Sequence, residues 1–101
     1  MKMRFSQASL TKILDQSVLY QCACPAQVCR HISQQRALYA YQSECLNLTD
    51  VDLAVHRRIA DAVRSNHAEM ESCLEDILRM EGWDMETLEM PDVLKARLLQ
   101  P

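Results

Sequence analysis

The chain has 101 residues and a formal net charge of −3, from 11 Lys and Arg against 14 Asp and Glu. This length predicts one domain, residues 1–101, with a small core that favours self-association. No basic block is present, so we expect no nucleic-acid partner. No apolar run approaches the roughly 18 residues of a membrane span, and no signal-peptide core follows the start, so we expect a cytoplasmic protein.

Helix-breaking residues are rare, because the chain contains one Gly and three Pro. Ala, Leu, Gln, Glu, Arg and Met, which favour helix, are frequent. We therefore predict an all-α protein, an antiparallel bundle of four to five helices with a long central hairpin.

Two helices are predicted in the first half of the chain. Apolar residues at helical spacing predict the first helix near residues 7 to 20, capped by Ser6 or Ser9. Pro25 suits the first position of a second helix, which we expect to run to about Leu46 with Cys24 outside it. Gln35 and Gln42 fall within the apolar stripe of that helix. They either pair across an interface or mark a partly covered face.

The longest amphipathic pattern follows from residue 49 to residue 83. Thr49 or Asp50 is expected to cap this third helix, and Gly82 is expected to end it. A helix of about 30 residues is about 45 Å long, so a second helix must lie alongside it. Trp83 is then expected to pack back on the bundle, before a last short helix from Pro91 to about Leu99.

Cysteine and histidine gather in the pattern C-x-C-x₄-C-x-H, which matches no standard zinc spacing. Within a helix from Pro25, Cys29 and His31 point about 160° apart and should not share a metal. If the hairpin turns near Leu48, residues whose numbers sum to about 96 lie at the same level, so Cys29 should face His67. By the same count Cys22 and Cys24 should face Cys73.

Three hypotheses follow for these cysteines. In the first, three cysteines bind zinc or an iron–sulfur unit together with a fourth ligand. The three are Cys22, Cys24 and Cys29, and the fourth is His67 or Cys73. In the second, Cys24 is a thiol at the helix N-cap that exchanges with Cys22 or Cys29 as a redox pair. In the third, the cysteines pack as small apolar groups.

Two further pairs at i, i+4 spacing can each offer two metal ligands. They are His67 with Glu71 and Asp52 with His56. His56 and His67 are about 16 Å apart along one helix and cannot bind one ion within a chain. The alternative is that each histidine is a hydrogen-bonded core residue.

The run from residue 38 to residue 83 contains the turn LYAYQSECLNL and the ending H-x-x-M-x-x-x-L-x-x-I-L-x-x-x-G-W. It resembles the helical hairpins of small ferritin-like proteins, including half-ferritins that dimerise into four-helix bundles. The E-x-x-H of the di-iron helices is missing, because Arg64 precedes His67 by three residues and Leu53 precedes His56 by three. The resemblance implies dimerisation and three ligand candidates: Glu44, His67 and Glu71.

No nucleophile–base set, phosphate loop or acid pair stands at a recognisable spacing. Two functional hypotheses therefore follow from the sequence. The first is a small cytosolic bundle that binds zinc or iron, or presents redox-active thiols, at the cysteine end. The alternative is a non-catalytic, dimeric interaction or assembly module with structural cysteines, whose partner is another helix.

Overall fold

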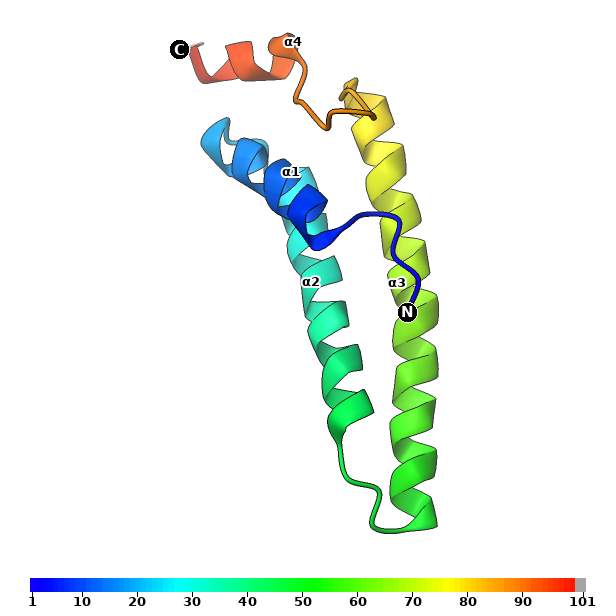
Figure 1. Cartoon of the computed structure of the whole chain (residues 1–101). Coiled ribbons are helices and arrows are strands. Elements are labelled where there is room, and N and C mark those ends of the chain that lie inside the picture. Colours follow the sequence, from blue (N-terminus) through cyan, green and yellow to red (C-terminus); the bar gives the residue numbers. More distant parts are fainter. Residues whose placement is uncertain (100–101) are drawn as a thin grey trace.

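Three long helices dominate the protein. The computed structural model describes residues 1–99, and none of these residues forms a strand, so the all-α prediction is confirmed. The helices are α1 (Gln7–Leu19), α2 (Ala23–Glu44) and α3 (Asp50–Glu81), followed by a single turn, α4 (Asp92–Lys95), and a 3₁₀ helix, η1 (Ala96–Leu99) (Figure 1). No helix among the described residues is both long and apolar enough to cross a membrane.

The ends of α1 and α3 lie where the local sequence predicted them. Ser6 caps α1 by accepting a hydrogen bond from the backbone N–H of Ser9. Thr49 caps α3 in a capping box, in which its hydroxyl accepts from the backbone N–H of Asp52 and the Asp52 carboxylate accepts from the N–H of Thr49. Gly82 ends α3 in the left-handed conformation, with φ 84°.

The start of α2 differs from the prediction. Its N-cap is Cys22, so Cys24 lies within the first turn and Pro25 is the third helical residue. Proline is tolerated there because the first N–H groups of a helix have no intrahelical acceptor. The helix also ends at Glu44, two residues before the expected Leu46.

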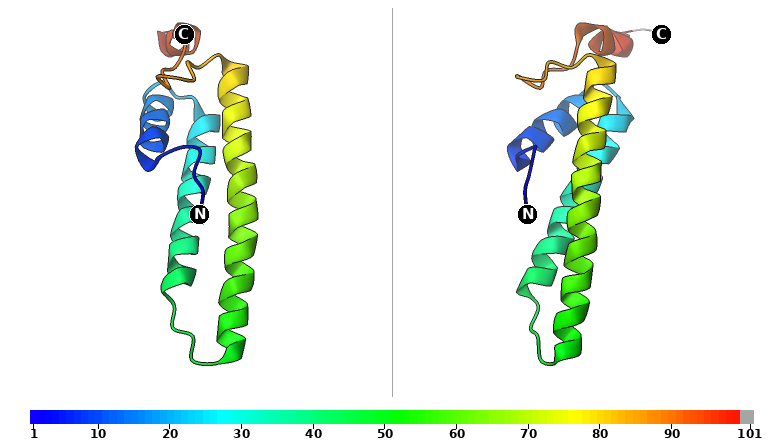
Figure 2. Two further views of the ribbon diagram at one scale, coloured as in Figure 1. Left: turned by 45° about the vertical axis from the view of Figure 1, so that its right-hand side comes forward. Right: turned by 90° about the vertical axis from the view of Figure 1, so that its right-hand side faces the viewer.

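Antiparallel packing of α2 against α3 forms a long hairpin, and α1 packs on α2 at one end of it (Figures 1 and 2). The molecule measures 59 × 21 × 18 Å. Residues 1–36 and 63–97 form what we call the closed end, where the N-terminal segment and the C-terminal turn cover the hairpin (Figure 2). Its core consists of ten side chains: Phe5, Leu10, Ile13, Cys29, Ile32, Leu74, Leu78, Trp83, Met90 and Leu94.

The other end of the hairpin, residues 37–62, has a different character, and we call it the arm. None of its side chains is fully buried. It consists only of the end of α2, the connection and the start of α3, and it extends beyond every other element in both views of Figure 2. Among the residues whose burial the structure describes, the apolar core is thus confined to the closed end.

The register of the hairpin differs from the expected one. The residue numbers of side chains that meet across it sum to 103 rather than 96, in three pairs: Cys22 with Glu81, Arg36 with His67, and Tyr39 with Arg64. The connection at 45–49 is not a tight turn but an extended segment that runs along the start of α3 (Figure 1). Five extended residues span about 16 Å, and α3 therefore begins well beyond the end of α2.

The segment after α3 folds back on the closed end. Trp83 is 4% exposed and belongs to the core, which confirms the expectation that it packs on the bundle. Gln16 of α1 holds the following turn, since its side chain donates to the Leu88 carbonyl and accepts from the Met90 N–H. The expected last helix is present as α4 and η1.

Candidate functional site

The cysteines predicted as metal ligands lie at different depths of the closed end. Cys22 and Cys73 are half-buried, Cys24 is exposed and Cys29 is 1% exposed. Among the described residues, no three Cys, His, Asp or Glu side chains are grouped so that they can hold a metal ion.

The observed register explains why His67 does not join Cys29. The residue numbers of side chains that face each other across the hairpin sum to 103, so Cys29 lies at the level of Leu74. His67 lies at the level of Arg36, which it contacts. The two levels are seven residues apart, or about 10 Å along the helix. The predicted facing of Cys29 and His67 is therefore wrong.

Burial keeps two of the cysteines as neutral thiols. Burial raises the pKa of Cys29 to about 11. Burial also raises the pKa of Cys22, and the Glu81 carboxylate, which accepts from its Sγ at 3.6 Å, raises it further. Because the thiolate is the nucleophile in thiol–disulfide exchange, neither side chain is activated for that reaction at neutral pH. The N-cap thiol is Cys22, not Cys24 as the redox hypothesis assumed.

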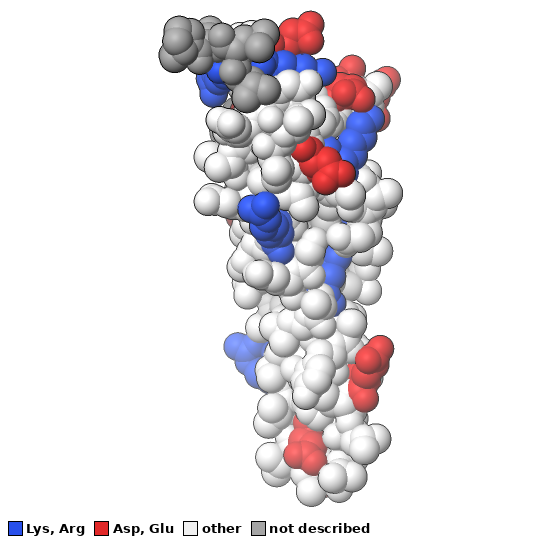
Figure 3. All heavy atoms as spheres, turned by 90° about the vertical axis from the view of Figure 1, so that its left-hand side faces the viewer, with Lys and Arg blue, Asp and Glu red and all other residues white. Residues whose placement is uncertain are grey.

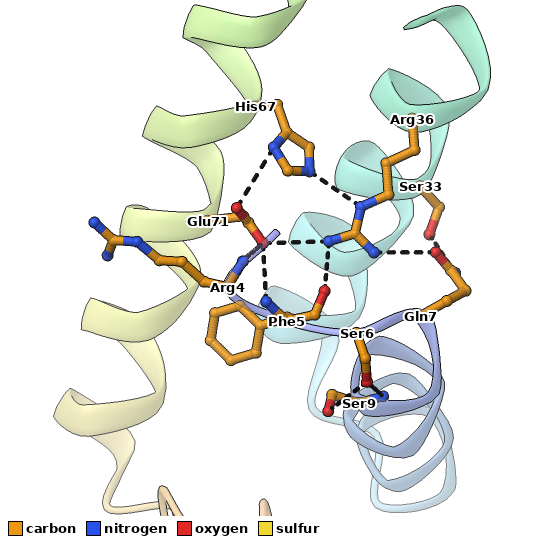
Figure 4. Close-up of polar contacts among 9 residues, drawn as sticks. All are labelled: Arg4, Phe5, Ser6, Gln7, Ser9, Ser33, Arg36, His67 and Glu71. Atoms are coloured by element: carbon orange, nitrogen blue, oxygen red, sulfur yellow. Dashed lines mark hydrogen bonds and ion pairs between the residues drawn. The ribbon is translucent and has the colours of Figure 1, made fainter. Parts of the chain in front are cut away.

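The most elaborate polar arrangement of the closed end lies instead around Glu71, which is 2% exposed (Figure 4). Glu71 Oε2 accepts from the backbone N–H of Arg4 at 2.7 Å and of Phe5 at 2.9 Å. The same oxygen pairs with Arg36 Nη2 at 3.2 Å, and that nitrogen also donates to the Phe5 carbonyl at 2.6 Å. One carboxylate of α3 and one guanidinium of α2 thus bind the N-terminal segment, residues 1–6, to the hairpin.

His67 completes this network in its neutral form. Arg36 Nε donates to His67 Nε2 at 3.0 Å, and since arginine is only a donor, the histidine proton must lie on Nδ1. Nδ1 faces Glu71 Oε1 at 3.4 Å. The pKa of His67 is lowered, chiefly by burial, with the Arg36 charge lowering it further and the Glu71 charge opposing this.

Both predicted two-ligand pairs have other hydrogen-bond partners. His67 and Glu71 belong to the network just described. Asp52 accepts from the N–H groups of Leu48 and Thr49, and His56 Nδ1 lies 2.7 Å from Asn47 Oδ1. These contacts support the alternative of hydrogen-bonded histidines.

Arg36 was not predicted as a site residue, although the sequence around it contains a signal. It is the sole charged residue between Arg30 and Glu44, in a chain in which one residue in four is charged. An isolated charge within a helix of low charge indicates a specific partner, because buried charges are paired. The partner itself depended on the hairpin register.

Below this network, the surface is hollowed between α2 and α3 along the arm and as far as Arg64. The hollow, which we call the arm groove, encloses about 220 Å³. Its lining combines amide, hydroxyl, imidazole and guanidinium groups: Tyr39, Gln42, Ser43, Asn47, Leu53, His56, Arg57, Ala60 and Arg64. Gln42 Oε1 and Gln35 Oε1 are buried and receive no hydrogen bond from the described residues.

Comparison with known proteins does not assign the chain to a family. No protein-family model matches the chain, and neither a curated protein nor a solved structure matches it. A functional conclusion therefore depends on the geometry of the closed end and of the arm.

Proposed function

We propose that the protein is a non-catalytic interaction module that works as a homodimer, joined through its arm. The observation that carries this proposal is that residues 37–62 contain no fully buried side chain. A pair of helices without a core has little to stabilise it in water, since most helical stability in proteins comes from packing of an apolar face. A second copy supplies that packing.

Apolar side chains are available on the arm for such a contact. Six large ones are exposed to between 44% and 81%: Leu38, Tyr41, Leu46, Leu48, Val51 and Val55. Two of them, Leu38 and Tyr41, lie one turn apart on α2 and form an exposed apolar pair there, of the kind that marks an interaction site. Tyrosine in particular is enriched at the centres of protein interfaces.

The outer face of α2 is suited to a copy of itself. Between Arg30 and Glu44 its one charged side chain, Arg36, is turned into the network of the closed end. Figure 3 views the molecule from this side, where Lys, Arg, Asp and Glu side chains are scattered with uncharged surface between them. Two such faces meet without like-charge repulsion, as the self-complementary interface of a two-fold dimer requires.

A pair of hairpins would also provide the bundle that the sequence predicts. One chain contributes the end of α2 and the start of α3 to the arm, so two chains contribute four helical segments, the number in a four-helix bundle. The resemblance of residues 38–83 to half-ferritin hairpins implies the same association. The four-to-five-helix bundle is thus proposed as a property of the dimer.

Sedimentation equilibrium of the full chain tests this proposal. We expect a particle of twice the 11.6 kDa chain mass at micromolar concentration. Tyr41→Glu should shift the protein to the monomer, because it places a charge in the apolar contact. Ser65→Glu adds the same charge at an exposed position of α3 outside the arm and should leave the dimer intact.

A wild-type chain that stays monomeric up to about 100 μM, well above the dissociation constants of ordinary stable interfaces, would overturn the proposal. Equal dissociation by Tyr41→Glu and Ser65→Glu would place the contact elsewhere and would also contradict it.

Metal binding at Cys22, Cys24, Cys29, His67 and Cys73 stays a prediction from the sequence, as does redox exchange of the thiols. Elemental analysis of untagged protein purified anaerobically tests it. Stoichiometric zinc or iron that is lost in Cys24→Ala would support a metal site. Protein without metal but with readily titrated thiols would favour the redox hypothesis.

A further inference from the structure

The arm groove continues a groove that the chain already fills with an extended segment of its own. At the closed end, the N-terminal segment lies between α2 and α3, where Arg36 and Glu71 bind its backbone (Figure 4). Tyr39 and Ser43 follow Arg36 on the same face of α2, at helical spacing. On α3, His67 is followed on the same face by four residues that line the arm groove: Arg64, Ala60, Arg57 and Leu53.

The arm groove presents positive charge. Arg57 and Arg64 lie on its wall, and no Asp or Glu is among the residues that line it. Arg64 lies 5.7 Å from the centre of the Tyr39 ring and pairs with Asp61 at 3.3 Å. Both members of that ion pair are more than half exposed, so the pair is weak and open to competition from another carboxylate.

One hydrogen-bond acceptor of a residue that lines the groove has no donor. Gln42 Oε1 is buried and unpaired among the described residues, although buried acceptors in proteins are nearly always satisfied. At the closed end, the corresponding requirement of Glu71 is met by backbone N–H groups of the N-terminal segment. If the Gln42 amide rotates toward the groove, an extended chain there can offer its oxygen an N–H in the same way.

From these observations we infer that the arm groove binds a short, extended, acidic segment of a partner protein. The positive wall selects carboxylates, which arginine binds through charge-assisted hydrogen bonds. The groove extends from Leu53 to Arg64, about 16 Å along α3, which is the length of about five extended residues. Acidic side chains at alternate positions of such a segment point to one side, toward Arg57 and Arg64.

Fluorescence anisotropy with the full chain tests this inference. The probe is a fluorescein-labelled peptide of four Glu–Ala repeats, and a peptide of four Gln–Ala repeats is its uncharged counterpart. We expect the acidic peptide to bind and the Gln–Ala peptide to bind at least about tenfold more weakly. Arg57→Gln should weaken binding of the acidic peptide by about tenfold.

Arg58→Gln is the matched control, because it removes the same charge from the next residue, which is exposed and does not line the groove. It should change the affinity less than about twofold, as expected for a rim charge screened by salt. Equal losses in Arg57→Gln and Arg58→Gln, equal binding of the two peptides, or no binding of the acidic peptide would overturn the inference. The inference does not rest on dimerisation, so a monomeric chain that binds the peptide would contradict the proposed function alone.

Discussion

Glu71 is the residue on which the attachment of the N-terminal segment most depends. Its side chain is 3% exposed and pairs with Arg36, whose side chain is 12% exposed. We expect Glu71→Gln to lower the free energy of unfolding by about 3 kcal/mol, because it leaves the Arg36 charge buried without its partner. Urea unfolding followed by helical circular dichroism, at fixed protein concentration, measures this change.

Glu75→Gln is the matched control for that substitution. Glu75 lies one turn further along α3 and pairs with Arg4 and Arg79, but these arginine side chains are more than half exposed. Its replacement should cost less than about 1 kcal/mol. If both variants lose the same stability, the buried network does not have the importance assigned to it.

The neutral state of His67 leads to a specific dependence of stability on pH. Its pKa in the folded protein is lowered from the ordinary 6.5, so the unfolded chain binds a proton more readily than the folded one. Its contribution is therefore fully present above about pH 6.5 and is lost as the pH falls below that value. Protonation would also place a hydrogen on His67 Nε2, which could then no longer accept the hydrogen bond from Arg36 Nε.

We expect the free energy of unfolding to fall between pH 6.5 and 5 with a slope of up to about 1.4 kcal/mol per pH unit. His67→Gln should flatten this slope, whereas His31→Gln, at an exposed position of α2, should preserve it. Urea unfolding at several pH values checks both variants. A slope that survives in His67→Gln would assign the effect to another group.

At the scale of the helices, substitutions of Gly82 measure how much one backbone conformation contributes to the free energy of unfolding. Its φ of 84° lies in the left-handed region, and a Cβ added there meets no atom within 4 Å. Gly82→Ala should therefore lower the free energy of unfolding by about 1 kcal/mol, through backbone strain alone. Gly82→Asn should lower it less, since asparagine tolerates this conformation. Equal effects of the two substitutions in urea unfolding would contradict this explanation.

The helix ends show which parts of the fold could be predicted from the sequence. The caps at Ser6 and Thr49 and the stop at Gly82 act within a few residues, so the ends of α1 and α3 were predictable. The start of α2 was less so, because proline fits any position of a first turn and does not mark which one.

The candidate site could be predicted only in part, because it depends on the register between α2 and α3. From their spacing, His67 and Glu71 were identified as a pair of candidate metal ligands, and the two side chains of this pair lie 3.4 Å apart. Its partner Arg36 was not, because the extended connection at 45–49 shifts the register by an amount that no local signal specifies. The same shift separates His67 from Cys29.

For the whole molecule, the contrast between closed end and arm predicts two levels of local stability. Backbone amides exchange with solvent through local opening, whose free energy is low where few apolar side chains are buried. The core side chains of α2 and α3, such as Ile32 and Leu74, belong to the closed end. Residues 37–62 contain none that is fully buried. In the monomer, amides of the arm should exchange faster than helical amides of the closed end.

Association changes this expectation in a way that depends on concentration. If two arms cover each other, binding protects the associated form in proportion to its population. Hydrogen exchange by mass spectrometry at about 1 μM and about 100 μM should then show slower exchange in peptides from 37–62 at the higher concentration, a range over which a dimer of ordinary affinity forms. Peptides from the core of the closed end should change little, and Tyr41→Glu should abolish the difference. Equal exchange of the arm at both concentrations would contradict association through the arm.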